Sequence, residues 1–131
     1  MRSARDCGIA AAILGALAVV LGAFGAHALR NQVPADSLAT WRTAVDYQFW
    51  HALALLGLAA FAGRTMEAGA ATWRSLRIAA VGFVVGIVLF SGSLYALVLG
   101  APRWIGAITP IGGVALIGAW LVLLAAFWRA R

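Results

Sequence analysis

Four long apolar runs, separated by short polar stretches, dominate the chain. They cover residues 8–29, 47–63, 78–100 and 105–128. Each is close to the roughly 20 residues that a helix needs to cross the hydrocarbon core of a bilayer. The pattern predicts an all-α membrane protein in which four transmembrane helices pack as a small bundle. At this length the bundle is a single domain over residues 1–131.

The stretch before the second run has helical character of its own. Pro34 suits the first turn of a helix, while Leu38, Trp41 and Val45 recur at helical spacing. We therefore expect the second helix to begin early, with an interfacial helical segment ahead of the span. Residues 64–77 are expected to form a short loop. The first run is longer than the apolar core of a secretory signal peptide, so we expect it to stay attached as a helix.

Composition and charge support this class and exclude others. Hydrophobic residues make up 64% of the chain and charged residues 11%, whereas soluble domains average about 45–50% and 25%. All ten basic residues are Arg, the net charge is +6, and the charges flank the apolar runs. Basic groups divided between two membrane faces cannot form the continuous stripe that tracks phosphates. We therefore expect the lipid bilayer as a partner and no nucleic acid.

The Arg residues also predict the orientation of the bundle. The two ends and the central loop carry seven Arg, and the other two loops carry three. Because cytoplasmic loops retain positive charge, both termini are expected in the cytoplasm, with residues 30–46 and 101–104 facing outward. Four aromatic residues near the ends of the runs are expected to act as interfacial anchors: Trp41, Trp73, Trp104 and Trp128.

Small residues mark the faces expected to pack closely, since helices in lipid approach one another where side chains are small. In the first run they recur at steps of three and four on one face: Gly15, Ala18, Gly22 and Gly25. In the third run Gly82 and Gly86 have the four-residue spacing of a helix-pairing motif. Such faces can join helices of one chain or of neighbouring chains. We favour an intrachain bundle, with homo-oligomers formed on top of it.

Polar side chains gather in one half of the membrane. Depth along the helices brings nine of them to the outer leaflet: His27, Asp46, Tyr47, Gln48, His51, Ser91, Ser93, Tyr95 and Thr109. Asp46 points away from His51 on the second helix and can reach Arg42, so His51 is expected to face Ser91 and Tyr95 on the third. Ionisable groups inside a membrane are candidates for function. The cluster is interpreted either as hydrogen-bonded support for the bundle or as a ligand site.

Catalytic and metal chemistry find little support in the residue pattern. No Ser-His-Asp arrangement or carboxylate pair has usable spacing, so no enzyme is expected. Two His residues on different helices, without cysteines or a paired Glu, make an incomplete set of metal ligands. No cofactor is expected. The single Cys7 permits no intrachain disulfide and is interpreted as structural.

Four ordered motifs carry a resemblance to a known family. They occupy residues 22–29 (GAFGAHAL), 47–56 (YQFWHALALL), 90–95 (FSGSLY) and 109–113 (TPIGG). With them the chain resembles the YgdD-like family of small inner-membrane proteins, which also has a small vertebrate transmembrane relative. The resemblance implies a four-helix protein of the bacterial inner membrane and carries over no settled activity. In the last motif, Pro and the Gly pair are expected to loosen the start of the fourth helix.

Three functional hypotheses follow from these patterns. The leading one is a non-enzymatic accessory or scaffold protein that packs with other membrane proteins, or with its own copies, through the small-residue faces. The alternative is a small-solute transporter or small-ligand-binding protein with an outward-facing polar pocket lined by His27, His51, Ser91 and Tyr95. The third is a haem or metal carrier.

Overall fold

The protein is an elongated bundle of long helices. The computed structural model describes residues 3–64 and 70–129, with side chains described for residues 3–62 and 73–129. In chain order the elements are α1 (Ala4–Phe24), the π-helical turn η1 (Gly25–Leu29), α2 (Ala35–Arg64), α3 (Ala70–Val98), the 3-10 turn η2 (Arg103–Ala107) and α4 (Ile108–Arg129). The described residues contain no strand, and the prediction of an all-helical fold is confirmed.

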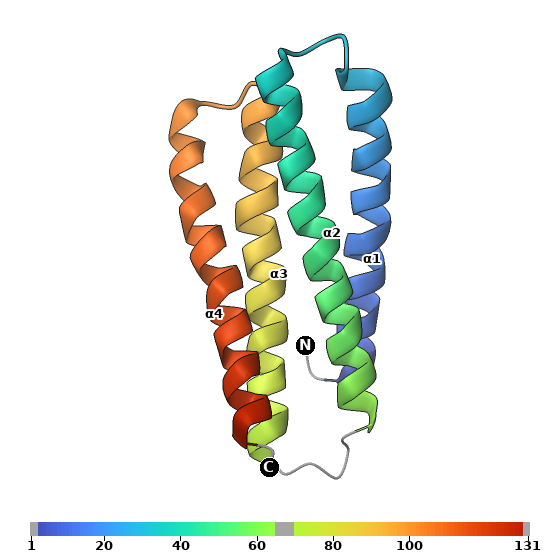
Figure 1. Cartoon of the computed structure of the whole chain (residues 1–131), viewed down its shortest axis with the longest axis vertical. Coiled ribbons are helices and arrows are strands. Elements are labelled where there is room, and N and C mark those ends of the chain that lie inside the picture. Colours follow the sequence, from blue (N-terminus) through green and yellow to red (C-terminus); the bar gives the residue numbers. More distant parts are fainter. Residues whose placement is uncertain (1–2, 65–69, 130–131) are drawn as a thin grey trace.

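Neighbouring helices run antiparallel, so that both short connections with helical turns lie at one end of the bundle (Figure 1). We call the end that carries η1 and η2 the η end, and the opposite end, with the start of α1 and the finish of α4, the termini end. Each helix packs on the next one along the chain, α1 on α2, α2 on α3 and α3 on α4. The result is a staggered row in which α1 and α4 are the outermost helices.

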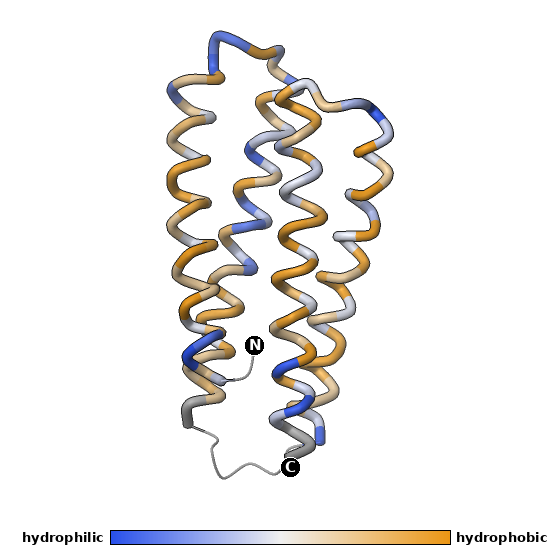
Figure 2. The backbone as a smooth tube through the Cα atoms, turned by 180° about the vertical axis from the view of Figure 1, so that it is seen from behind, coloured by the Kyte–Doolittle hydropathy of each residue, from blue (hydrophilic) through white to orange (hydrophobic). Residues whose placement is uncertain are grey.

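Within residues 3–64 and 70–129, three segments are long and apolar enough to cross a membrane: Ala4–Leu29, Trp73–Val98 and Arg103–Arg129. Length and composition do not support the expected fourth span, although α2 is the longest helix, with 30 residues. The reason is its polar content. Figure 2 shows hydrophilic residues recurring along α2, whereas α1 is mostly hydrophobic.

The element boundaries differ from the expected ones in two places. The interfacial segment expected before the second span is the first part of α2, in one uninterrupted helix from Ala35. α3 already begins at Ala70, so most of the expected loop 64–77 is helical, apart from residues 65–69, which lie outside the described residues.

The start of α4 is not loosened, contrary to expectation. The helix runs without a break from Ile108 through the Pro and Gly positions to Arg129. Pro110 falls in the first helical turn, where a backbone N–H has no partner within the helix, so its missing donor costs little. Gly112 faces α3 so closely that an added β-carbon would meet the backbone of Phe90. The glycine therefore serves close packing.

Local hydrogen bonds and backbone geometry fix the start of α1 and the end of α3. The Ser3 hydroxyl accepts a hydrogen bond from the Asp6 backbone N–H at 3.2 Å, and the Asp6 carboxylate accepts one from the Ser3 N–H at 3.2 Å, which together form a capping box. At the end of α3, Gly100 has a φ of 94°, in the left-handed region that favours glycine. The Ala101 N–H then donates to the Ala96 carbonyl at 2.9 Å and closes the helix.

The small residues of α1 and α3 pack within the chain. A β-carbon on Gly15 would lie 4.0 Å from Ala52 Cβ, and one on Gly22 would lie 3.4 Å from Val45, so this face of α1 lies on α2. Ala18, on the same face, is 1% exposed.

On α3, a β-carbon on Gly82 would lie 3.0 Å from Ala119, and one on Gly86 would meet Leu116. Both contacts are made with α4. The main apolar core includes buried residues of all four helices, among them Cys7, Leu55, Phe83 and Leu116. Close approach at glycines thus fixes two of the three helix pairs that hold the bundle together.

Candidate functional site in the polar core

Gln48 joins three helices at the centre of the bundle. It projects from α2, is 4% exposed, and donates from Nε2 to the Leu14 carbonyl of α1 at 2.8 Å. Its Oε1 accepts a hydrogen bond from the Tyr95 hydroxyl of α3 at 3.0 Å. A buried amide is costly unless its donor and acceptor are paired. Here both ends of the amide are paired, so Gln48 acts as a polar link between α1, α2 and α3.

Trp41 fills the space beside this link, toward the η end. Its indole N–H donates to the Leu21 carbonyl of α1 at 2.8 Å, and its ring lies 4.6 Å from the Tyr95 ring. The residue is 2% exposed, so the expected role as an interfacial anchor is wrong. The cause is Gly25 on η1, where an added β-carbon would lie 2.5 Å from Trp41 Cδ1. Because Gly25 has no side chain, the Trp41 indole ring packs directly against η1 at this position.

His51 connects α2 to α4. Its Nε2 lies 3.3 Å from the Trp120 indole nitrogen, and its Nδ1 lies 2.7 Å from the Tyr47 carbonyl oxygen. Because an indole N–H can only donate, Nε2 is the acceptor and the ring proton is on Nδ1, which donates to Tyr47. Both ring nitrogens are therefore engaged. Instead of the expected Ser91 and Tyr95, His51 Nε2 bonds to Trp120 of α4, while on α3 the His51 ring packs beside Phe83, with ring centres 5.6 Å apart.

A hydrogen bond between two hydroxyl groups links α3 to the start of α4. Ser93 Oγ donates to the Phe90 carbonyl at 2.9 Å and lies 2.7 Å from Thr109 Oγ1. Since the single Ser93 proton is used on Phe90, the Thr109 hydroxyl donates to Ser93. The pair lies next to the backbone contact of Gly112, so polar and steric contacts together hold the first turn of α4.

Ser91 differs from the other polar residues of the core. It is 1% exposed, and among the described residues its hydroxyl has no hydrogen-bond partner. A Ser in a helix ordinarily satisfies its hydroxyl on a carbonyl one turn earlier or on a neighbour. Its expected partner His51 is occupied by Trp120 and Tyr47.

Two of the predicted residues lie outside the core. His27 is exposed on η1, and Asp46 is exposed on α2. Asp46 and Arg42 line a shallow groove of about 200 Å³ between α1 and α2, and the structure records no ion pair between these two described residues. The nine predicted residues therefore do not form one pocket. They divide into the Gln48 link, the His51 contact and the Ser93 pair, with Ser91 nearby and two residues at the surface.

Beside His51 the bundle has a lateral groove between α2 and α4. It has a volume of about 420 Å³ and is lined by Tyr47, Trp50, His51, Phe90, Gly113, Leu116, Ile117 and Trp120. Trp120 is not among the residues predicted from the sequence, because it lies in the middle of an apolar run. The feature that could have identified Trp120 from the sequence is its indole N–H, because a hydrogen-bond donor that is buried or embedded in a membrane needs an acceptor.

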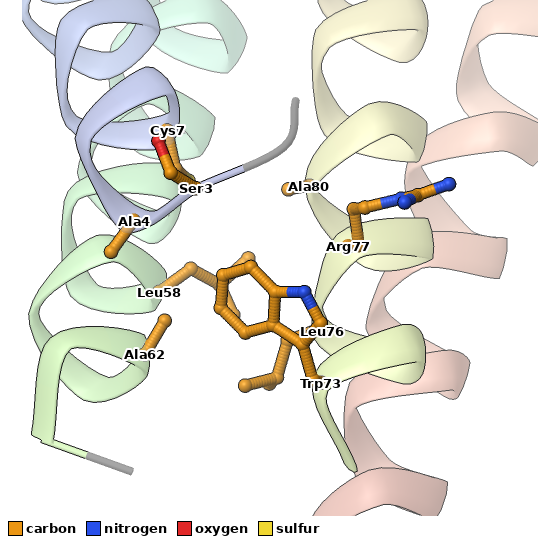
Figure 3. A pocket seen from close by; sticks show the side chains of 9 residues that line it. All are labelled: Ser3, Ala4, Cys7, Leu58, Ala62, Trp73, Leu76, Arg77 and Ala80. Carbon is orange, nitrogen blue, oxygen red and sulfur yellow. The ribbon is translucent and has the colours of Figure 1, made fainter. Parts of the chain in front are cut away.

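A second, much smaller cavity lies at the termini end (Figure 3). It has a volume of about 20 Å³, with Cys7 and Leu58 on one side and Trp73 and Ala80 of α3 on the other, which is room for about one water molecule. Cys7 donates from Sγ to the Leu55 carbonyl at 3.3 Å. In Figure 3 the Arg77 side chain points away from Cys7. The cavity thus offers a space for water and not for a larger ligand.

Metal ligands do not gather in the described part of the chain. There, no group of three or more His, Cys, Asp or Glu residues could hold a metal ion. The core histidine also has both ring nitrogens engaged. The haem or metal hypothesis therefore finds no donor set among these residues.

Comparison with known proteins identifies the family. A family model described as a protein of unknown function (DUF423) matches residues 21–113, which include Gln48, His51, Ser93 and Tyr95. The UPF0382 inner membrane protein YgdD of Escherichia coli is 40% identical over 123 residues, 94% of this chain and 89% of that protein. The chain belongs to this family. The resemblance noted from the four motifs is confirmed.

Other members of the family match over most of their length. The UPF0382 membrane protein SSP2132 of Staphylococcus saprophyticus is 48% identical over 118 residues, 86% of this chain and 91% of that protein. The UPF0382 membrane protein YwdK of Bacillus subtilis is 44% identical over 118 residues, 90% of this chain and 92% of that protein. These names state a membrane location and no activity. No solved structure matches the chain.

Proposed function

We propose that α2 crosses the membrane together with the other three helices, so that the chain is a four-span protein of the bacterial inner membrane with both termini in the cytoplasm. At about 1.5 Å per residue, the 30 residues of α2 extend about 45 Å, more than the roughly 30 Å of a hydrocarbon core. Its polar side chains Gln48 and His51 are buried and paired inside the bundle. Polar groups satisfied in this way do not bar a helix from lipid.

The topology has a direct test. Alkaline phosphatase and green fluorescent protein fused after Asn31 report the side of the α1–α2 connection, and the same reporters fused after Ala70 report the start of α3. A four-span protein places Asn31 outside, with active phosphatase, and Ala70 inside, with fluorescence. Two positions on the same side would mean that α2 does not cross, and would refute the arrangement.

Within this topology we propose a non-enzymatic role, in which the protein associates laterally with other membrane helices as an accessory or scaffold. The observation that supports it is the pairing of the core polar groups, which leaves Gln48, His51 and Ser93 engaged in holding helices together. The small-residue faces of α1 and α3 are occupied within the chain. Lateral association therefore uses other surfaces.

The free side of α1 is the surface best placed for a partner helix. Among the packed helix pairs, α1 has α2 as its neighbour, and its opposite side carries large apolar residues such as Ile13 and Val20, 55% and 62% exposed. A partner or a second copy would cover them without disturbing the core.

Site-specific photocrosslinking in the native host tests this role. A benzophenone amino acid at Ile13 or Val20 should give one dominant protein adduct, either with a partner or with a second copy. The same probe at Leu53, 51% exposed on α2, controls for contacts made by any exposed position. Adducts with lipid alone at both α1 positions would count against the accessory role.

A second candidate function is favoured by the lateral groove beside His51. The polar pocket expected from the sequence is not assembled, since His27 is at the surface and Tyr95 is bonded to Gln48. The groove is apolar and aromatic instead. A ligand held there would be a hydrophobic molecule that enters sideways from the membrane.

A further inference from the structure

The lateral groove beside His51 lies halfway along the helices that form it. Leu116, which lines the groove on α4, is the middle residue of the apolar segment Arg103–Arg129. Trp50, which lines it on α2, lies at the midpoint of that helix. In a bundle that stands upright in the bilayer, the groove is therefore about 15 Å from either surface of a roughly 30 Å hydrocarbon core.

Two hydrogen-bond donors of the groove lack an acceptor. Tyr47 and Trp50 both line it, and among the residues that the structure describes neither the Tyr47 hydroxyl nor the Trp50 indole N–H has a hydrogen-bond partner. His51 cannot serve them, because both of its ring nitrogens are engaged. Water and lipid head groups are too far away at this depth, and an unpaired donor in an apolar medium is costly. A ligand of this groove should therefore carry hydrogen-bond acceptors.

The walls of the groove favour a planar ring. Tyr47 stacks on Phe90 of α3 with ring centres 4.5 Å apart, and the Trp50 ring lies 5.4 Å from the Tyr47 ring. Trp50 on α2 and Trp120 on α4 are 57% and 50% exposed, so an indole is open to a ligand on both sides. Aromatic rings pack on other rings in offset or edge-on arrangements. The volume of about 420 Å³ also falls within the roughly 300–1,000 Å³ of small-molecule sites.

Depth selects among the molecules that a membrane contains. The ester and phosphate oxygens of a phospholipid stay near the membrane surfaces, about 15 Å from the middle of the hydrocarbon core, and do not reach these donors. An ionised carboxylate is costly at this depth. A prenylated quinone instead has a planar ring, a hydrocarbon tail and two uncharged carbonyl oxygens, which accept hydrogen bonds. It can therefore bring acceptors to the middle of the membrane.

We propose that the lateral groove binds the ring of a prenylated quinone, whose carbonyl oxygens accept hydrogen bonds from Tyr47 Oη and Trp50 Nε1. The ring packs beside Trp120 on α4, and the tail extends into the bilayer. This inference names the ligand class for the second candidate function given above and rests on it. It also rests on the four-span arrangement, because the crossing of α2 places Trp50 at the middle of the membrane.

Photolabelling of the whole chain in phosphatidylcholine nanodiscs tests the ligand class. A ubiquinone analogue with an aryl azide on its tail should give saturable adducts on the peptides that contain Trp50 and Trp120. Decylubiquinone should displace it, whereas decylbenzene, which has a ring and the same tail but no carbonyl, should not at an equal mole fraction. Equal displacement by both competitors would overturn the quinone and leave a groove for hydrophobic molecules. Labelling that never saturates would overturn both.

Two variants remove the donors and keep the aromatic rings. Tyr47→Phe and Trp50→Phe should each raise the probe concentration for half-maximal labelling about fivefold, the factor expected for one neutral hydrogen bond. The matched control is Trp104→Phe, which makes the same change at an exposed residue that does not line the groove. It should leave the half-maximal concentration unchanged. Wild-type values for both donor variants would overturn the hydrogen bonds and with them the quinone.

A third variant tests the location. Gly113 lines the groove, and a β-carbon there would lie 3.7 Å from the Phe90 ring, so Gly113→Leu places a side chain in the ligand space and should abolish saturable labelling. Gly118→Leu, on the same helix and in open space outside the groove, should not. Undiminished labelling of Gly113→Leu would overturn the site. The reporter fusions after Asn31 and Ala70 separate this failure from that of the four-span arrangement, because they report the crossing of α2 without any ligand.

Discussion

Replacing Gln48 by Leu removes the polar link between three helices while keeping a side chain of similar size. The Leu14 carbonyl belongs to the backbone ladder of α1 and loses little. The Tyr95 hydroxyl, however, loses its acceptor inside the bundle. An unpaired buried donor costs about 1–3 kcal/mol, and a hydrogen bond between membrane helices contributes about 0.6 kcal/mol on average. We therefore expect a loss of about 2 kcal/mol in the free energy of unfolding.

A double-mutant cycle makes this prediction specific to the contact. Tyr95→Phe alone leaves the Gln48 oxygen unpaired and should cost about 1 kcal/mol. In the double variant no buried group is left unpaired and only the two interhelix hydrogen bonds of Gln48 are missing, so the loss should be about 1 kcal/mol instead of the roughly 3 kcal/mol of independent sites. Equilibrium unfolding in mixed micelles, followed by tryptophan fluorescence, measures all four proteins. Strictly additive losses would refute the link between α2 and α3.

Further contacts give separate predictions. Gly112→Ala should lower the free energy of unfolding by about 1–3 kcal/mol, because its methyl group would meet the α3 backbone. Gly118→Ala lies in open space and should raise the free energy of unfolding by up to about 1 kcal/mol. Equilibrium unfolding of both variants compares the two values directly. Ser93→Ala removes the acceptor for the hydroxyl at the start of α4 and should cost about 1 kcal/mol, measured in the same assay. Trp120→Phe removes the hydrogen-bond donor to His51 and should also lower the free energy of unfolding by about 1 kcal/mol. Because the two residues are coupled, the double variant His51→Leu/Trp120→Phe should lose the same amount as Trp120→Phe alone.

The helices and one packing face could be read from the sequence because those signals are local. Apolar runs and helical spacing predict an all-helical protein, and the early start of the second helix follows from Pro34 and the spacing after it. The glycines of α1 recur on one face, and the structure places that face against α2. A periodic pattern within one helix carries this information without reference to any other helix.

The partners across helices could not be read in the same way. Ser91 and Tyr95 were expected as the partners of His51, because its own helix fixes only a direction and its actual partner Trp120 lies 69 residues away in the chain. Trp41 looked like an interfacial anchor because it is near the end of a run, yet it is buried by a notch at Gly25 on another helix. Such contacts depend on how helices rotate against each other, which no local pattern encodes.

Disulfide crosslinking between α1 and α2 in native membranes tests the intrachain bundle most directly. In a Cys7→Ser background, Gly15→Cys and Ala52→Cys place two β-carbons about 4.0 Å apart, within the roughly 3.5–4.5 Å that a disulfide requires. Mass spectrometry under mild oxidation should find an intramolecular bridge in a monomeric chain. Crosslinked dimers in place of that bridge would show that the glycine face joins separate chains, and would contradict the bundle described here.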